Sequence, residues 1–171
     1  MNINETLKHY FGYDSLRPGQ QELIEGILQR KDVLGIMPTG AGKSLCYQVP
    51  ALMLDGITIV VSPLISLMTD QVKALNQAGV HAAYINSSLT ENQIRTALFY
   101  AAQGRYKIIY VAPERLNTMR FLEFACQVDI SMVTVDEAHC ISQWGQDFRP
   151  SYVGIADFLA QLPKRPVVSA F

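Results

Sequence analysis

The chain has 171 residues, of which 49% are hydrophobic and 17% charged, and its formal net charge is −1. This length suits one domain with a substantial core, and the composition excludes an intrinsically disordered chain. A net charge near zero gives no broad electrostatic signal for nucleic acid, so any nucleic-acid site must be local. No apolar run is long enough to cross a membrane, and the first residues lack the features of a signal peptide. A cytoplasmic location is expected, or a nuclear one in a eukaryote.

The three cysteines are odd in number and show no C-x-x-C spacing. This pattern predicts neither a zinc site nor a disulfide framework. We expect Cys46, Cys126 and Cys140 to be buried, reduced thiols.

Apolar, β-branched runs alternate with helix-length segments along the chain. The runs predict strands at residues 33–36, 57–61, 82–85, 107–111, 130–135 and 167–169. The segments between them predict helices at 42–53, 63–78, 90–103, 117–126 and 151–161, and a further helix is expected to start near Gly19. Such alternation is typical of an α/β fold with a mostly parallel sheet and helices on both faces. Ligands of these sheets bind at the carboxyl ends of the strands, where each motif described below falls.

The sequence M-P-T-G-A-G-K-S lies at residues 37–44, between a predicted strand and a predicted helix. A glycine-containing loop in this context is typical of a phosphate-binding P-loop. Gly40 and Gly42 permit left-handed backbone conformations that turn successive N–H groups toward an anion. Lys43 would contact the β- and γ-phosphates, and Ser44 would bind Mg²⁺. The strict pattern has Gly where this loop begins with Met, so a chance glycine-rich turn is the alternative.

The strand predicted at 130–135 runs directly into Asp136 and Glu137. An apolar strand that ends in two acids has the Walker B arrangement. Asp136 would hold Mg²⁺, and Glu137 would orient and deprotonate the water that attacks the γ-phosphate. Two adjacent acids after a buried strand are costly unless a cation or hydrogen bonds compensate them. The same pair could simply start a helix, but the P-loop upstream favours a nucleotide site.

Together these motifs resemble those of superfamily 2 helicases, and their flanks resemble the RecQ family of DNA helicases. The resemblance is carried by M-P-T-G-A-G-K-S-L-C-Y-Q at 37–48 and D-E-A-H-C-I-S-Q-W-G at 136–145, and it extends from residue 10 to residue 171. In that family Met is usual at the start of the P-loop, and Ala41 stands where Gly is frequent. The resemblance implies that residues 1–171 are the first RecA-like ATP-binding domain, with a P-loop NTPase fold. Because the sequence stops just after a strand, we expect it to be a fragment of a longer chain.

The resemblance further implies an ATP-dependent 3′–5′ DNA helicase and DNA-stimulated ATPase, acting in DNA repair or recombination. Its cofactors would be ATP and Mg²⁺. Its partners would be single-stranded or duplex-junction DNA and the second RecA-like lobe of the same full-length chain, with no membrane. In a bacterium it would be cytoplasmic and associated with the nucleoid. The second lobe would supply an arginine finger, so the 171 residues alone should bind nucleotide weakly and hydrolyse it very slowly.

Residues 10–20 resemble the family's adenine-recognition motif. A side-chain amide can pair with adenine, and an aromatic ring or a guanidinium can stack on it. The resemblance implies that Gln20 contacts the adenine edge while Tyr13 and Arg17 stack; the residues alone indicate only a turn before a helix. The nucleotide-binding residues of the P-loop would be Thr39, Gly40, Ala41, Gly42, Lys43 and Ser44.

The loops after the second and fourth predicted strands resemble motifs Ia and Ib, which meet the DNA backbone. Ser62 and the N–H groups of the helix that follows suit a phosphate, although an ordinary strand-to-helix turn explains them equally well. Arg115 could contact phosphate, or could pair on the surface in the neighbourhood of Glu114. His139, which as a lone histidine is most often structural, would relay between the nucleotide site and the Ser-Ala pair at 169–170.

Residues 141–150 hold the only tryptophan of the sequence, together with a phenylalanine and an arginine. Aromatic rings on a loop can stack on bases of any sequence, or can anchor the loop by burial. The segment resembles the aromatic-rich loop that couples single-strand binding to ATP hydrolysis in the family. Gln146 departs from the family, where His is common, which puts the strength of coupling in question. The resemblance implies coupling roles for Gln143, Trp144, Phe148 and Arg149.

Two other functions stay open. An RNA helicase of the same superfamily would share the P-loop and the acids, but the loop at 141–150 resembles the DNA family. A non-catalytic, nucleotide-gated DNA-binding module would not need Glu137 as a base.

Overall fold

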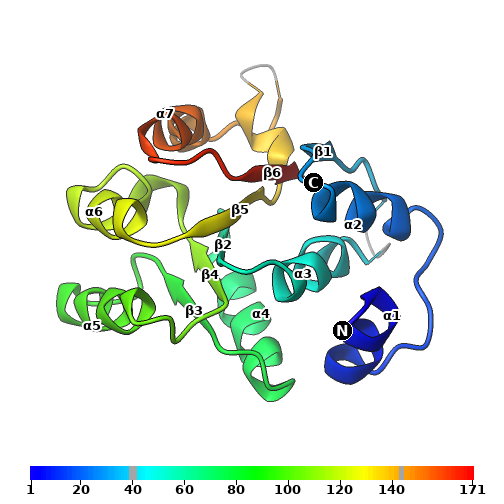
Figure 1. The fold of residues 1–171 in the computed structure, drawn as a ribbon. Coiled ribbons are helices and arrows are strands. Elements are labelled where there is room, and N and C mark those ends of the chain that lie inside the picture. The colour runs from blue at the N-terminus through cyan, green and yellow to red at the C-terminus, as the bar shows by residue number, and fades with distance from the viewer. Residues whose placement is uncertain (39–41, 143–144) are drawn as a thin grey trace.

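The computed structural model describes residues 1–38, 42–142 and 145–171. This part of the chain contains a six-stranded sheet in the order β1-β6-β5-β2-β4-β3, and each recorded strand pair is parallel (Figure 1). The strands are β1 (Val33–Leu34), β2 (Ile57–Val61), β3 (Ala82–Ile85), β4 (Ile108–Val111), β5 (Ile130–Val135) and β6 (Val167–Ala170). The predicted α/β fold with a mostly parallel sheet is confirmed.

Central strands match the sequence prediction better than the edge strand β1. β2 and β5 have the predicted bounds and are buried along their whole length, as strands covered on both faces must be. β1 has only two residues at the sheet edge, and the last recorded bond to β6 runs from the Gly35 N–H to the Ala170 carbonyl at 2.8 Å. Leu34 is 65% exposed and Ile36 is 91% exposed, so the predicted strand at 33–36 was too long.

The main helices are α2 (Gln20–Leu28), α3 (Lys43–Met53), α4 (Ile65–Gln77), α5 (Glu91–Ala102), α6 (Met119–Gln127) and α7 (Gly154–Gln161). The helix predicted at 151–161 begins instead as a 3-10 turn, Pro150–Val153, which continues into α7. α5 begins at a capping box. The Thr90 side chain accepts from the Gln93 backbone N–H, and the Gln93 side chain accepts from the Thr90 backbone N–H. Polar residues that satisfy the first N–H groups thus fix where this helix starts.

The sequence analysis missed the first helix, α1 (Ile3–Thr6), which continues into a π-helical turn at Leu7–Phe11. Its signal was available, since Asn2 and Glu5 form a capping box. The fully buried Leu7 packs this segment against α2 and α3.

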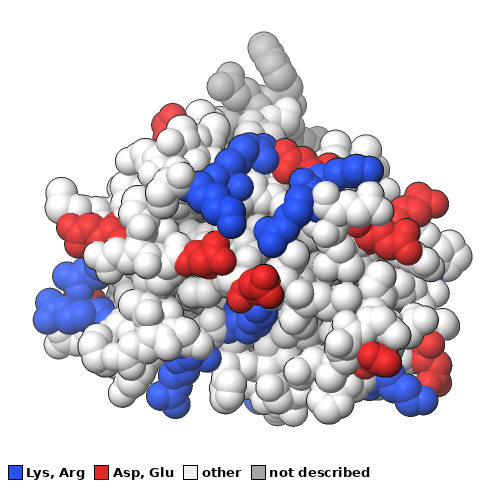
Figure 2. Space-filling model, viewed as in Figure 1, with Lys and Arg blue, Asp and Glu red and all other residues white. Residues whose placement is uncertain are grey.

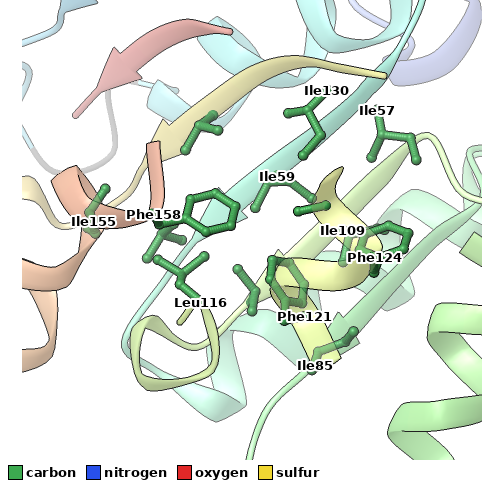
Figure 3. Packing of buried hydrophobic residues seen from close by; sticks show 14 of the residues in the cluster. Ile57, Ile59, Ile85, Ile109, Leu116, Phe121, Phe124, Ile130, Ile155 and Phe158 are labelled. Atoms are coloured by element: carbon green, nitrogen blue, oxygen red, sulfur yellow. The ribbon is translucent and has the colours of Figure 1, made fainter. Parts of the chain in front are cut away.

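Helices cover both faces of the sheet (Figure 1). On one face α5, α6 and α7 pack on β2, β4 and β5; Figure 3 shows Phe121, Phe124 and Phe158 from these helices beside the strand isoleucines. On the other face α2, α3 and α4 contribute Ile27, Tyr47 and Met68 to a second cluster. These two cores hold the carboxyl ends of the strands and the start of α3 in fixed relation.

Within the described residues, none of the helices combines the length and apolarity needed to cross a membrane. Cys46 and Cys140 are buried thiols as expected. Cys126 is exposed, which corrects the prediction of burial for all three cysteines.

Candidate active site

The end of the P-loop is tied to the segment before α2. Gly42 is the N-cap of α3 with φ of 78°, and an added Cβ would come within 2.5 Å of Gln20 Nε2. Gln20 is buried; its Nε2 donates to the Gly42 carbonyl at 2.9 Å, and its Oε1 accepts from the Arg17 N–H at 2.7 Å. A side chain at position 42 is therefore excluded both by the left-handed backbone and by this close approach.

The two acids leave β5 at the carboxyl edge of the sheet. Asp136 is 3% exposed, and its backbone N–H still donates to Val61 of β2. Glu137 adopts a left-handed conformation with φ of 53°, unusual for a residue other than glycine. Its N–H donates to Asp136 Oδ1 at 3.0 Å, and the Tyr152 hydroxyl donates to the Asp136 carbonyl at 2.7 Å. The turn is thus over-determined and directs both carboxylates toward the start of α3.

Lys43 joins the P-loop to the acids. Its Nζ lies 3.2 Å from Asp136 Oδ1 and 3.1 Å from Glu137 Oε1. Burial alone would lower the pKa of Lys43, but the charges and hydrogen bonds of the two carboxylates outweigh burial and raise it above its usual value. The ammonium stays charged and provides the compensation that the two acids require.

These groups line one cleft of about 720 Å³, a volume typical of small-ligand sites. Its walls come from β1 and the loop after it, the start of α3, α4 and the turn after β5. Arg17, predicted to stack on the base, also lines the cleft. Tyr13 is 53% exposed and is not among the described lining residues. The predicted contacts Thr39, Gly40 and Ala41 lie outside the described residues.

Ser44 and Asp136 both line the cleft, as the predicted Mg²⁺ site requires. The Ser44 hydroxyl accepts a hydrogen bond from Gln71 Nε2 at 3.3 Å. Hydroxyl and carboxylate oxygens are the hard ligands that Mg²⁺ prefers, and this ion usually takes few protein ligands. The donor set fits the ion. Gln71 itself was missed by the sequence analysis, because its contact with Ser44 joins two separate helices.

The predicted DNA-backbone residues are less accessible than expected. Ser62 has no exposed surface, and its hydroxyl has no hydrogen-bond partner within the described residues. Arg115 forms an ion pair with Glu91 at 3.3 Å, so the structure contains the surface pairing that was one of its two alternatives. Acidic and basic side chains are interspersed on the face seen in Figure 2, and neither sign forms a broad field there.

His139 bridges the acids and the loop that follows. Its Nδ1 lies 3.5 Å from Glu137 Oε2, and its Nε2 lies 3.5 Å from Asp147 Oδ2. The Ser169 hydroxyl instead pairs with Thr134 at 2.8 Å. The described contacts of His139 therefore lead to the loop at 141–150 and not to residues 169–170.

The aromatic loop is described in part. Phe148 is half-buried and Arg149 is exposed. The backbone N–H of Arg149 donates to the Cys140 carbonyl at 2.9 Å. The predicted coupling residues Gln143 and Trp144 lie outside the described residues.

A family model described as DEAD/DEAH box helicase matches residues 17–170, which include the P-loop, the two acids and most of the cleft. The chain belongs to the DEAD/DEAH box helicase family. Nucleotide use follows from this membership.

Similar proteins within this family sharpen the comparison. The chain is 52% identical over 165 residues to the "ATP-dependent DNA helicase RecQ" of Bacillus subtilis, covering 96% of this chain and 28% of that protein. It is 45% identical over 168 residues to the "Probable ATP-dependent DNA helicase RecS" of the same organism, covering 98% of this chain and 34% of that protein. The resemblance to RecQ helicases expected from the motifs is confirmed, and the chain spans about a third of the relatives' length or less.

The fold is also similar to solved helicase structures. A hypothetical ATP-dependent RNA helicase from Sulfolobus tokodaii superposes with a TM-score of 0.75 at 21% identity, covering all of this chain and 50% of that one. At this identity the likeness supports the fold alone. The expected RecA-like fold is confirmed.

Proposed function

We propose that this chain is the first RecA-like motor lobe of an ATP-dependent DNA helicase. It binds Mg²⁺-ATP in the cleft and, together with a second lobe, couples ATP hydrolysis to 3′–5′ movement along single-stranded DNA. The observation that carries the proposal is the contact of Lys43 with both Asp136 and Glu137, 3.2 and 3.1 Å away. It brings a P-loop lysine and two Walker B acids together at the carboxyl edge of the sheet.

Lys43 exchanges partners when nucleotide binds. Without nucleotide, Lys43 Nζ contacts two carboxylates. A triphosphate in the same cleft would present it with a higher density of negative charge. Transfer of Lys43 to the β- and γ-phosphates releases Glu137, whose side chain is partly exposed. Glu137 then accepts a proton from the attacking water as that oxygen bonds to the γ-phosphorus, and the bond to the ADP oxygen breaks.

Ser44 and Asp136 hold Mg²⁺ in this proposal. When bound there, the ion would supply positive charge that offsets the negative charge of the triphosphate. Asp136 suits this task because its backbone is fixed by Val61 and Tyr152 and its side chain is already buried. Gln20 and Arg17 form the adenine end of the site, beside Gly42.

Two observations support DNA as the partner: the loop at 141–150 and the names of the similar proteins. His139 connects this loop to Glu137 through contacts of 3.5 Å on each side. A change in the loop on DNA binding would therefore be transmitted directly to the proposed base. Phe148 and Trp144 supply the stacking surfaces, and Arg149 supplies charge for the phosphates.

ATP hydrolysis by the longest natural form of the chain, measured without nucleic acid, with single-stranded DNA and with single-stranded RNA, tests the proposal. We expect strong stimulation by DNA alone, and its loss in Trp144→Ala with basal hydrolysis retained. Equal stimulation by RNA would favour an RNA helicase. Nucleotide binding without hydrolysis under any condition would favour a non-catalytic module.

A further inference from the structure

Gln71 connects the helix α4 to the P-loop. Its Nε2 donates to Ser44 Oγ at 3.3 Å, and its Oε1 accepts from Gln48 Nε2 at 2.9 Å. Ser44 and Gln48 both belong to α3, whereas Gln71 lies on the neighbouring helix. One side chain thus bridges the two helices beside the proposed metal site.

The Gln71 amide belongs to a network of hydrogen bonds that reaches into the core. Gln48 is 4% exposed, and its Nε2 donates both to Gln71 and to the Tyr110 hydroxyl at 3.0 Å. In this arrangement both N–H groups of Gln48 donate, and Gln71 presents its oxygen to Gln48 and its N–H to Ser44. The Tyr110 hydroxyl in turn lies 3.0 Å from the Tyr47 hydroxyl, so the network continues into the core.

Both tyrosines stay neutral and keep this network uncharged. Burial raises the pKa of Tyr110 to about 12, despite the opposing hydrogen bonds from Tyr47 and Gln48. Burial also raises the pKa of Tyr47 well above its usual value. The network therefore acts through geometry and not through proton transfer at physiological pH.

A serine hydroxyl has two acceptor sites and one proton. Gln71 fills one acceptor site of Ser44, and the Tyr47 side chain also hydrogen-bonds that hydroxyl. Together they restrict rotation of the hydroxyl and leave one lone pair for a metal ion. Residues that orient a metal ligand in this way commonly change metal affinity by about 10–100-fold when they are replaced.

We propose that Gln71 is a positioning residue that orients Ser44 for Mg²⁺ and links that orientation to α4. The start of α4 is accessible, with Leu64 and Ile65 43% and 41% exposed, and it follows the loop of Ser62 that was predicted to meet DNA. A ligand that shifts this end of α4 would thereby move Gln71 and alter the metal site. The inference rests on the proposed function.

Nucleotide binding by Gln71→Met tests the assignment, since Met keeps the length of the side chain and removes both hydrogen bonds. Affinity for a fluorescent ATP analogue is measured with excess Mg²⁺ and again with EDTA. We expect about tenfold weaker binding in Mg²⁺ and unchanged binding in EDTA. Gln77→Met, at the exposed end of the same helix, is the matched control and should behave as wild type in both.

A double-mutant cycle with Ser44→Ala separates positioning from general damage. If Gln71 acts through Ser44, then Gln71→Met should have no further effect once the hydroxyl is absent. Equal losses in Mg²⁺ and EDTA, or a full additional loss in Ser44→Ala, would overturn the inference while leaving the proposed function intact. Failure of the wild-type chain to bind nucleotide in either buffer would overturn both.

Discussion

Two half-buried lysines at opposite ends of the strands have opposite pKa shifts. At the carboxyl end, Asp136 and Glu137 raise the pKa of Lys43 despite its burial. At the amino end, burial lowers the pKa of Lys107, and nearby acids offset this only in part. Lys107 Nζ donates to the carbonyls of the turn between α3 and β2, namely those of Leu54, Asp55 and Gly56.

The difference lies in the partners. Main-chain carbonyls are held by the fold on either side and cannot leave Lys107, so its ammonium only closes a turn. The partners of Lys43 are side-chain carboxylates in an open cleft, and we propose that its ammonium exchanges them for a phosphate. A charged lysine therefore indicates a binding site when its partners are side chains that a ligand can displace, and not when they are main-chain carbonyls fixed by the fold.

The largest expected effect comes from removing Glu137, the proposed base. In Glu137→Gln the side chain can no longer accept a proton, so hydrolysis should fall by a factor on the order of 10²–10⁴ while nucleotide binding persists. Phosphate release in single turnover measures this, with the longest natural form of the chain in excess over labelled ATP and with single-stranded DNA present. Glu123→Gln, an exposed acid on α6, is the control. Hydrolysis at the wild-type rate in Glu137→Gln would remove Glu137 from the mechanism.

A purely structural effect is expected at the other lysine. Lys107→Met leaves three carbonyls without their charged donor, so the free energy of unfolding should fall by about 2 kcal/mol. Urea denaturation measures this loss, with the exposed Lys73→Met on α4 as the control. An unchanged unfolding midpoint would mean that the turn does not depend on Lys107.

The smallest effect is a pair of opposite pH slopes near the unfolded pKa of lysine, about 10.4. The raised pKa of Lys43 means that the folded state binds more protons above this value, so stability is lost as pH rises through the folded pKa. The lowered pKa of Lys107 means the reverse: stability is gained as pH rises from the folded pKa to about 10.4.

Replacing each lysine should remove its contribution to the pH dependence of the unfolding free energy. Between pH 9 and 11.5, the unfolding free energy of Lys43→Met should fall less steeply than that of wild type, and that of Lys107→Met more steeply. Identical slopes in the two variants would contradict the assigned environments.

Sequence reasoning predicted the parts of this domain that local patterns encode. The runs that form β2 and β5 are continuously apolar because both faces are buried, and the Gly-Lys-Ser and Asp-Glu pairs are short, ordered motifs. It failed at β1, where apolar Ile36 is exposed at a sheet edge, since composition does not report position in the sheet.

Contacts between distant segments were beyond local patterns. The bonds from Gln71 to Ser44 and from Lys107 to the turn after α3 join separate elements and leave no spacing signal. Burial was likewise beyond local patterns: Ser62 is a polar residue directly after a strand, yet tertiary packing covers it completely.

Calorimetric binding of a non-hydrolysable ATP analogue with Mg²⁺ to wild type, Lys43→Met and Lys107→Met tests the difference between the two lysines most directly. We expect Lys107→Met to bind as wild type does. Binding by Lys43→Met should be weaker by a factor on the order of 10–100, because it loses charged hydrogen bonds of about 1.5–3 kcal/mol. Wild-type affinity in Lys43→Met, or an equal loss in Lys107→Met, would contradict the account.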